Sequence, residues 1–153
     1  MKRQQKYPDT STFHYHNANP KNRITGDCRI RAISIACEVP YNQVVMDLAK
    51  IQCETGYDQC CNQGLDILLK QYGWKKQKQP RKDDNTKYTG REFCEQLQAD
   101  PWIFTGKEND HNTRIVANIG ANHIVAIVEG KVWDIWNSTG GCIGNYWTKE
   151  CTA

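Results

Sequence analysis

A cysteine and a histidine about a hundred residues apart are the side chains of this chain that are best suited to chemistry. Cys28 follows Gly26 and Asp27 and directly precedes the apolar run of a predicted helix. A helix N-terminus lowers the pKa of a thiol, because partial positive charge and free N–H groups lie beside the sulfur. A thiolate nucleophile also needs a base that the fold brings close. Among the four histidines, His123 begins a predicted strand, so we expect Cys28 to be the nucleophile and His123 its base.

A catalytic histidine is held in one tautomer by a third group, and two residues downstream compete for this role. If residues 129–130 form a two-residue hairpin turn, Asp134 lies diagonal to His123 on the same sheet face. A three-residue loop would shift the register by one residue and place Asn137 opposite His123. We favour Asp134, because the two-residue turn needs no bulge and Gly130 can adopt the positive φ that it requires.

A helical Cys followed by a His that opens a strand resembles the papain-like cysteine peptidases, from about Asn17 onward. The resemblance implies a Cys-His-Asp/Asn triad, no cofactor, and attack on an amide, ester or isopeptide carbonyl of a protein or peptide. It leaves hydrolysis and transfer to an amine both open. "GDCRIRAI" is also similar to the nucleophile region of ovarian-tumour-type deubiquitinases, where Gly-x-Cys precedes an Arg-Ala pair; their frequent Asp three residues before Cys is Thr25 here. The spacing from His123 to Asp134 is similar to that of bacterial cell-wall cysteine peptidases.

Asn22 lies six positions before Cys28, where papain and the bacteriocin-processing peptidases carry a Gln whose amide donates to the oxyanion. Asn has the same amide on a side chain that is one methylene shorter. Asn22 could therefore complete an oxyanion hole with the backbone N–H of Cys28. The alternative is a turn residue in a polar loop.

The elements that must position these residues follow from the apolar spacing. The pattern predicts four helices: one from Cys28 to about Glu38, a second that follows Pro40 and whose apolar face runs from Tyr41 to Ile51, a third stopped by Gly73, and a short one opened by the capping box Thr89–Glu92. After Pro101 we expect the strands "WIFT", "RIVANI", "HIVAIV", "KVWDIW" and "CIGNYW". Helices followed by an antiparallel sheet predict an α+β fold of papain-like type. We expect residues 1–153 to form a single domain, with residues 1–24 as an irregular arm packed on it.

The composition limits the class of protein. The chain has 153 residues, a net charge of +3 and eight cysteines, without an apolar run as long as a membrane span. We expect a cytoplasmic protein with reduced thiols and no membrane association. Neither Cys60 with Cys61 nor His14 with His16 provides a zinc ligand set, so we expect no metal.

Two other functions remain open at this stage. A papain-like domain without catalysis could be a binding or inhibitory module, such as a phage or mobile-element accessory protein that captures a host factor. The basic segment at residues 75–84 could contact nucleic acid. We consider nucleic acid an unlikely partner, because Asp83 and Asp84 follow the positive charges and no nucleic-acid-reading motif accompanies them.

Overall fold

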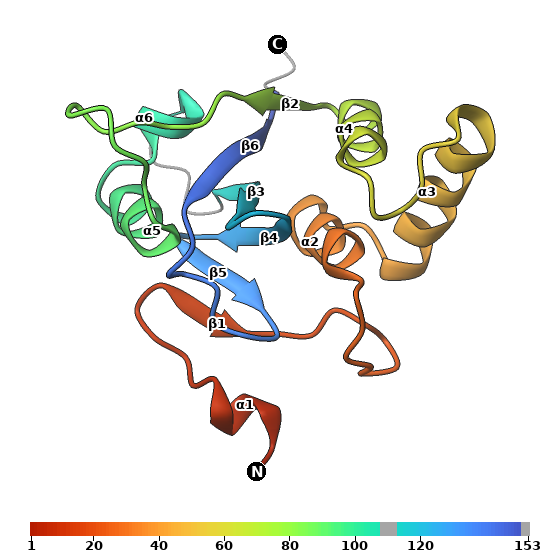
Figure 1. Ribbon diagram of the computed structural model, residues 1–153, viewed down its shortest axis with the longest axis horizontal. Helices are drawn as coiled ribbons and strands as arrows, with labels where there is room; N and C mark the ends of the chain where they lie inside the picture. Colours follow the sequence, from red (N-terminus) through yellow and green to blue (C-terminus); the bar gives the residue numbers. More distant parts are fainter. Residues whose placement is uncertain (108–112, 151–153) are drawn as a thin grey trace.

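The computed structural model describes residues 1–107 and 113–150, which build a six-stranded mixed sheet with helices on both faces (Figure 1). The helices in these residues are α1 (Arg3–Lys6), α2 (Cys28–Cys37), α3 (Tyr41–Thr55), α4 (Asn62–Gln71), α5 (Gly90–Ala99) and α6 (Trp102–Thr105). The strands are β1 (Phe13–Tyr15), β2 (Trp74–Gln77), β3 (Arg114–Ile119), β4 (His123–Val128), β5 (Lys131–Asp134) and β6 (Ile143–Lys149). Their order across the sheet is β1-β5-β4-β3-β6-β2. The α+β class is therefore confirmed.

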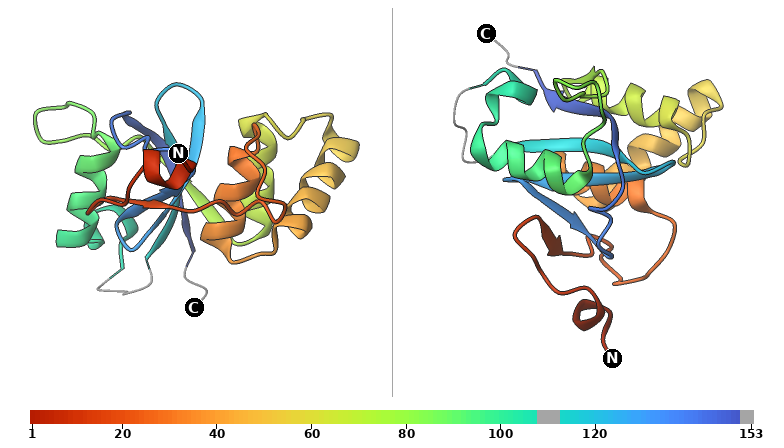
Figure 2. Two further views of the ribbon diagram at one scale, coloured as in Figure 1. Left: turned by 90° about the horizontal axis from the view of Figure 1, so that it is seen from below. Right: turned by 60° about the vertical axis from the view of Figure 1, so that its left-hand side comes forward.

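The sheet separates two hydrophobic cores. Helices α2, α3 and α4 cover one face, and α5 and α6 lie on the other side (Figures 1 and 2). Successive side chains of a strand point to opposite faces, so Val116 of β3 joins the core under α2, while Ile115 and Ala117 join the core under α5. Because both faces of the central strands β3 and β4 are buried, their sequences are nearly continuous apolar runs.

Helix α2 lies against the middle of the sheet, because one side of it is apolar. Ile30, Ile33 and Ala36 are buried in the core that α2 shares with β3 and β4. The helix ends at Cys37, its C-cap residue Glu38 adopts the left-handed conformation, and Pro40 follows two residues later. At the other end of α2, Cys28 meets the beginning of β4, where its thiol hydrogen-bonds to the backbone of Ile124.

The predicted helices α2 to α5 are confirmed, and so are the signals at their ends. Thr89 Oγ1 accepts a hydrogen bond from the N–H of Glu92, whose carboxylate accepts one from the N–H of Thr89, as a capping box requires. Gly73 has a φ of +87° just after α4.

The hairpin between β4 and β5 has the two-residue turn that the sequence predicts. Val128 pairs with Lys131, and Glu129 and Gly130 have φ angles of +52° and +73°. Positive φ at both central residues is the type I′ geometry that suits the twist of a hairpin. The register places Ala126 opposite Trp133, so no bulge shifts β5.

The strand predicted at "WIFT" is wrong, because Trp102–Thr105 is the short helix α6. The aromatic and β-branched residues favour a strand, but Pro101 precedes the helix and Gly106 ends it in the left-handed conformation. The helix also lets Phe104 stack on Phe93 of α5, with the ring centroids 4.3 Å apart.

Two further predictions about irregular and antiparallel structure need correction. Residues 1–24 are not wholly irregular: they contain α1 and β1, and β1 pairs in parallel with β5, so the sheet is mixed rather than antiparallel. Phe13 of β1 is fully buried and supplies the apolar contact that holds the strand there. Likewise, Lys75–Gln77 of the expected basic connection belong to edge strand β2, which pairs with β6. Among the described residues, none of the helices has the length and apolar character needed to cross a membrane.

Candidate active site

Cys28 is the first residue of α2, with its thiol turned toward the start of β4. Burial raises the pKa of this thiol, but hydrogen bonds with the His123 side chain and the Ile124 backbone lower it by more, and the positive charges of His123 and Arg29 lower it further. The net effect is a pKa below the ordinary value. Among the described residues, the N-cap residue Asp27 makes no side-chain hydrogen bond to the first turn of α2, so that turn's N–H groups remain available near the sulfur.

In two other cysteines the effect of burial on the thiol outweighs that of the neighbouring groups. Burial raises the pKa of Cys37, at the other end of α2, and of Cys94, on α5, to about 12. These thiols stay protonated at neutral pH. The environment of Cys28 therefore differs in kind from that of a structural cysteine.

His123 connects the thiol to a carboxylate. Its Nε2 lies 2.5 Å from Oδ2 of Asp134, which leaves Nδ1 as the ring nitrogen that can serve Cys28. Burial lowers the pKa of His123, but the hydrogen bonds and negative charges of Asp134 and Cys28 outweigh it and raise the pKa to about 9. The ring of Trp136 packs on the imidazole, with the centroids 5.0 Å apart.

The two pKa shifts have opposite directions, and together they favour charge separation. A lowered pKa at Cys28 and a raised pKa at His123 stabilise the thiolate beside the imidazolium. Asp134 supports this pair, since its charge lies on the far side of the ring. The geometry can thus hold a nucleophile and a proton donor ready at neutral pH.

Arg31 holds the carboxylate of Asp134 in place, and our sequence analysis did not single it out. Its Nη1 donates to Oδ1 of Asp134 at 2.7 Å, and the N–H of Ile135 donates to the same oxygen at 2.7 Å. Oδ2 of Asp134 is thereby left to His123. Both members of this ion pair are nearly inaccessible, with 4% of the Arg31 side chain and 1% of the Asp134 side chain exposed. The available signal was an arginine within the apolar run of a helix predicted to be buried.

A second carboxylate extends the network. Asp27 Oδ1 accepts from Arg31 Nε at 2.8 Å, and its Oδ2 accepts from the Tyr41 hydroxyl at 2.6 Å and from Asn19 Nδ2 at 3.0 Å. Burial raises the pKa of Asp27, but these hydrogen bonds lower it by more, so the carboxylate stays charged. Burial and the contact with Asp27 raise the pKa of Tyr41 to about 12. Arg31 therefore joins the residue before the nucleophile to the partner of the histidine.

The two alternatives for the third residue occupy different places. Asp134 contacts His123 directly, as described above. Asn137 instead folds its own loop, because its Oδ1 accepts from the N–H of Thr139 at 3.1 Å and from the hydroxyl of Thr139 at 2.6 Å.

Asn22 has the geometry of a turn residue. Its φ is +53°, its N–H donates to the carbonyl of Asn19 at 2.9 Å, and its Oδ1 accepts from Asn17 Nδ2 at 3.3 Å. Within residues 1–107 and 113–150, Nδ2 of Asn22 donates to no protein group, and no hydrogen bond joins Asn22 to Cys28. The donor atom that an oxyanion would need is thus unused, and the predicted role stays a prediction.

His14 lies on β1, and His16 directly follows this strand. His14 and His16 flank the ring of Trp133, and His14 Nδ1 is 2.7 Å from Oδ2 of Asp9. His111 lies outside the described residues. Within the described part of the chain, no three His, Cys, Asp or Glu side chains gather closely enough to hold a metal ion.

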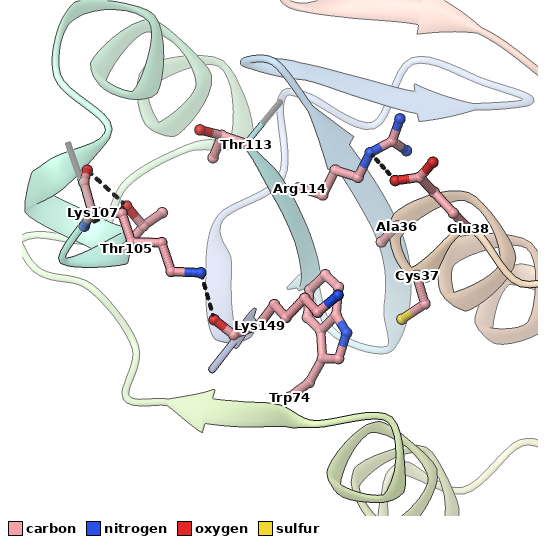
Figure 3. A pocket seen from close by; sticks show the side chains of 9 residues that line it. All are labelled: Ala36, Cys37, Glu38, Trp74, Thr105, Lys107, Thr113, Arg114 and Lys149. Carbon is pink, nitrogen blue, oxygen red and sulfur yellow. Dashed lines mark hydrogen bonds and ion pairs between the residues drawn. The ribbon is translucent and has the colours of Figure 1, made fainter. Parts of the chain in front are cut away.

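Two cavities lie at opposite ends of α2. One adjoins Cys28 and is lined by residues on both sides of it, from Thr25 to Ile30. The other, shown in Figure 3, is lined by Cys37 at the end of α2, by Trp74 of β2, and by Lys107 and Lys149. Comparison of the chain with protein-family models, with curated proteins and with solved structures finds no match in any of the three.

Proposed function

We propose that this protein is a papain-like thiol hydrolase that cleaves amide or isopeptide bonds in proteins or peptides. One observation carries the proposal: Cys28, His123 and Asp134 form a continuous chain of contacts, in which the pKa of the thiol is lowered and that of the imidazole is raised. Perturbed pKa values in this combination are typical of activated cysteine nucleophiles.

The mechanism follows from the charges. The Cys28 thiolate attacks the substrate carbonyl carbon, and the carbonyl electron pair moves to oxygen. When the tetrahedral intermediate collapses, the C–N bond breaks and the His123 imidazolium gives its proton to the leaving amine, which leaves a thioester on Cys28. Water then attacks the thioester while His123 takes up a proton, and the acid is released as Cys28 returns to its starting state. Asp134 keeps His123 in the correct tautomer throughout.

The oxyanion is stabilised by the N-terminus of α2 in this proposal. The backbone N–H of Cys28 points out of the first turn, and the unused Nδ2 of Asn22 is the second donor. Because donors fixed before the reaction need no reorganisation, they favour the transition state over the ground state.

The arrangement of elements supports the papain-like interpretation. The nucleophile begins a central helix, the histidine begins a strand of the sheet on which that helix packs, and the carboxylate ends the next strand (Figure 1). Residues from three elements thus meet at one end of α2.

Selective alkylation tests the proposal. At pH ~6 an ordinary thiol is mostly protonated, so we expect iodoacetamide to label Cys28 before the other seven cysteines. Peptide mapping by mass spectrometry gives the order of labelling. Cys53 is the matched control, since it is exposed on α3 and requires no opening of the fold.

The comparison of variants completes this test. We expect Cys28→Ala to remove the fast-labelling site and the hydrolysis of a peptide library, while Cys53→Ala retains both. Equal labelling of Cys28 and Cys53 would show that Cys28 is not activated and would favour a catalytically silent binding module on the same fold.

A further inference from the structure

A pocket of about 350 Å³ adjoins the proposed nucleophile. It lies between the N-terminal end of α2, the side of α3 and the turn that contains Gln59 and Cys60. Thr25, Gly26 and Asp27, which precede Cys28, line its wall, and so does Arg29, which follows Cys28. Cys28 itself does not line the pocket, but the charge of Arg29 is close enough to lower the pKa of its thiol. A substrate whose carbonyl is at Cys28 can therefore place a neighbouring side chain in this pocket.

Arg29 gives the pocket a positive charge that forms no ion pair with a carboxylate of residues 1–107 or 113–150. Its Nε and Nη2 donate to the same neutral oxygen, Oδ1 of Asn62, at 3.1 and 2.8 Å. Among the described residues, no Asp or Glu forms an ion pair with Arg29. Asn62 thus fixes the direction of the guanidinium and leaves the N–H groups of Nη1 for another acceptor.

The carboxylate in the pocket wall is already engaged. Both oxygens of Asp27 accept hydrogen bonds, one from Arg31 and the other from Tyr41 and Asn19. Asp27 therefore does not compete for Arg29. The positive end of α2 adds to the attraction for an anion at this place.

Part of the wall is apolar, beside the polar side chains of Thr25 and Gln59. Ile30 is buried in the core below, and Val45 and Tyr41 of α3 pack against that core at the side of the pocket. A site with one apolar side and one oriented guanidinium matches a side chain with methylene groups and a terminal carboxylate, because Arg binds carboxylates through paired N–H donors.

We infer that this pocket binds an acidic side chain of the substrate close to the scissile carbonyl, with Arg29 as the residue that determines this specificity. The inference rests on the proposed function, since it takes Cys28 as the attacking group. It assigns the substrate class that the catalytic residues alone leave open.

Paired electrophilic peptides test the inference. Two short peptidyl vinyl sulfones differ only in Glu or Gln at one of the two residues before the reactive group, and each position is tested in turn. The rate of Cys28 labelling is measured by mass spectrometry of the intact protein. At one position we expect the Glu probe to react about tenfold faster, the size of one charge-assisted hydrogen bond that is partly open to solvent.

Variants then show whether Arg29 causes the preference. Arg29→Gln should bring the ratio of the Glu and Gln rates to about one, and the ratio cancels any change in the reactivity of Cys28 itself. Arg91→Gln makes the same change in net charge on α5, on the other side of the sheet, and should keep the preference (Figure 1).

The failures of the two proposals are distinguishable. If Cys28 reacts rapidly with both probes at equal rates, or if Arg29→Gln retains the preference for Glu, the acidic pocket is wrong and the thiol hydrolase stands. If Cys28 reacts with neither the probes nor iodoacetamide faster than Cys53 does, the proposed function is wrong and the specificity is wrong with it.

Discussion

The proposed chemistry depends on the proton that Cys28 and His123 share. The reactive ion pair exists above the lowered pKa of Cys28 and below the raised pKa of His123, which is about 9. Turnover against pH should therefore be bell-shaped: it falls on the acid side as Cys28 gains a proton, and on the alkaline side as His123 loses the proton that the leaving amine needs.

Asp134→Asn tests which residue sets the alkaline side of this profile. Removing the negative charge lowers the pKa of His123, so the alkaline limb should move to lower pH, and turnover should fall by about 10²–10⁴-fold because the tautomer is no longer fixed. Asn137→Ala is the matched control, since Asn137 contacts Thr139 rather than the imidazole. A severe loss in Asn137→Ala with a mild effect in Asp134→Asn would reverse the assignment of the third residue.

The proposed oxyanion role of Asn22 can be tested separately from its role in the turn. Its φ of +53° suits glycine, so Asn22→Gly removes the amide while the backbone keeps its conformation. We expect turnover to fall by about 10²–10³-fold, the usual effect of losing an oxyanion donor, with unchanged thermal unfolding. If the turnover of Asn22→Gly, measured by steady-state kinetics, is within a few-fold of the parent value, Asn22 serves only the turn.

At the level of elements, Arg31 joins α2 to β5. Its guanidinium forms ion pairs with Asp27 just before the helix and with Asp134 at the end of the strand. Arg31→Met leaves both carboxylates buried without this partner, which should lower the free energy of unfolding by about 3–5 kcal/mol. Urea denaturation measures the change. Arg31→Lys keeps the positive charge but lacks the paired N–H donors of the guanidinium, so it should be more stable than Arg31→Met and less stable than the parent.

An exposed ion pair provides the comparison for Arg31. Arg91 contacts Glu95 at 3.0 Å on the surface of α5, so Arg91→Met should change the free energy of unfolding by at most about 1 kcal/mol. Similar losses in the two variants would mean that the buried network contributes no more than a surface pair does.

The sequence predicts those elements whose signals are local. Helix α5 carries its capping box in four consecutive residues, and the turn at Gly130 fixes the register that brings Asp134 to His123. By contrast, Trp102–Thr105 has strand-forming residues in a helix, since the neighbouring proline and glycine and the packing of Phe104 decide its conformation. The sequence does not predict strands β1 and β2, because each pairs with a strand far away in the chain. No local pattern of apolar residues indicates these pairings.

The candidate site shows the same division between local and distant information. Cys28 and His123 could be found because each begins an element that the sequence marks. Arg31 escaped notice, since its two partners become visible only when α2 lies against the end of β5. A buried ion network depends on the tertiary structure, and the sequence shows only that a charged residue stands among apolar ones.

On the scale of the whole molecule, the N-terminal segment supports the strand that carries Asp134. Strand β1 covers one edge of β5: the N–H of Val132 donates to the carbonyl of Thr12, and the N–H of His16 donates to the carbonyl of Asp134 (Figure 1). Phe13 anchors this segment in the core under α5. Stability and the position of the Asp134 carboxylate, the third member of the proposed triad, are thus coupled through Phe13.

Phe13→Ala tests this coupling. The side chain is fully buried, so its removal should lower the free energy of unfolding by about 3–5 kcal/mol, as measured by urea denaturation. Trp102→Ala removes a larger aromatic ring that is 55% exposed, and should cost less than about 1 kcal/mol. Because β5 would lose support along one edge, hydrogen exchange at the Val132 amide should also accelerate more in Phe13→Ala than in Trp102→Ala. If Phe13→Ala has the free energy of unfolding of the parent protein and keeps the Val132 amide protected, β1 does not help to position Asp134.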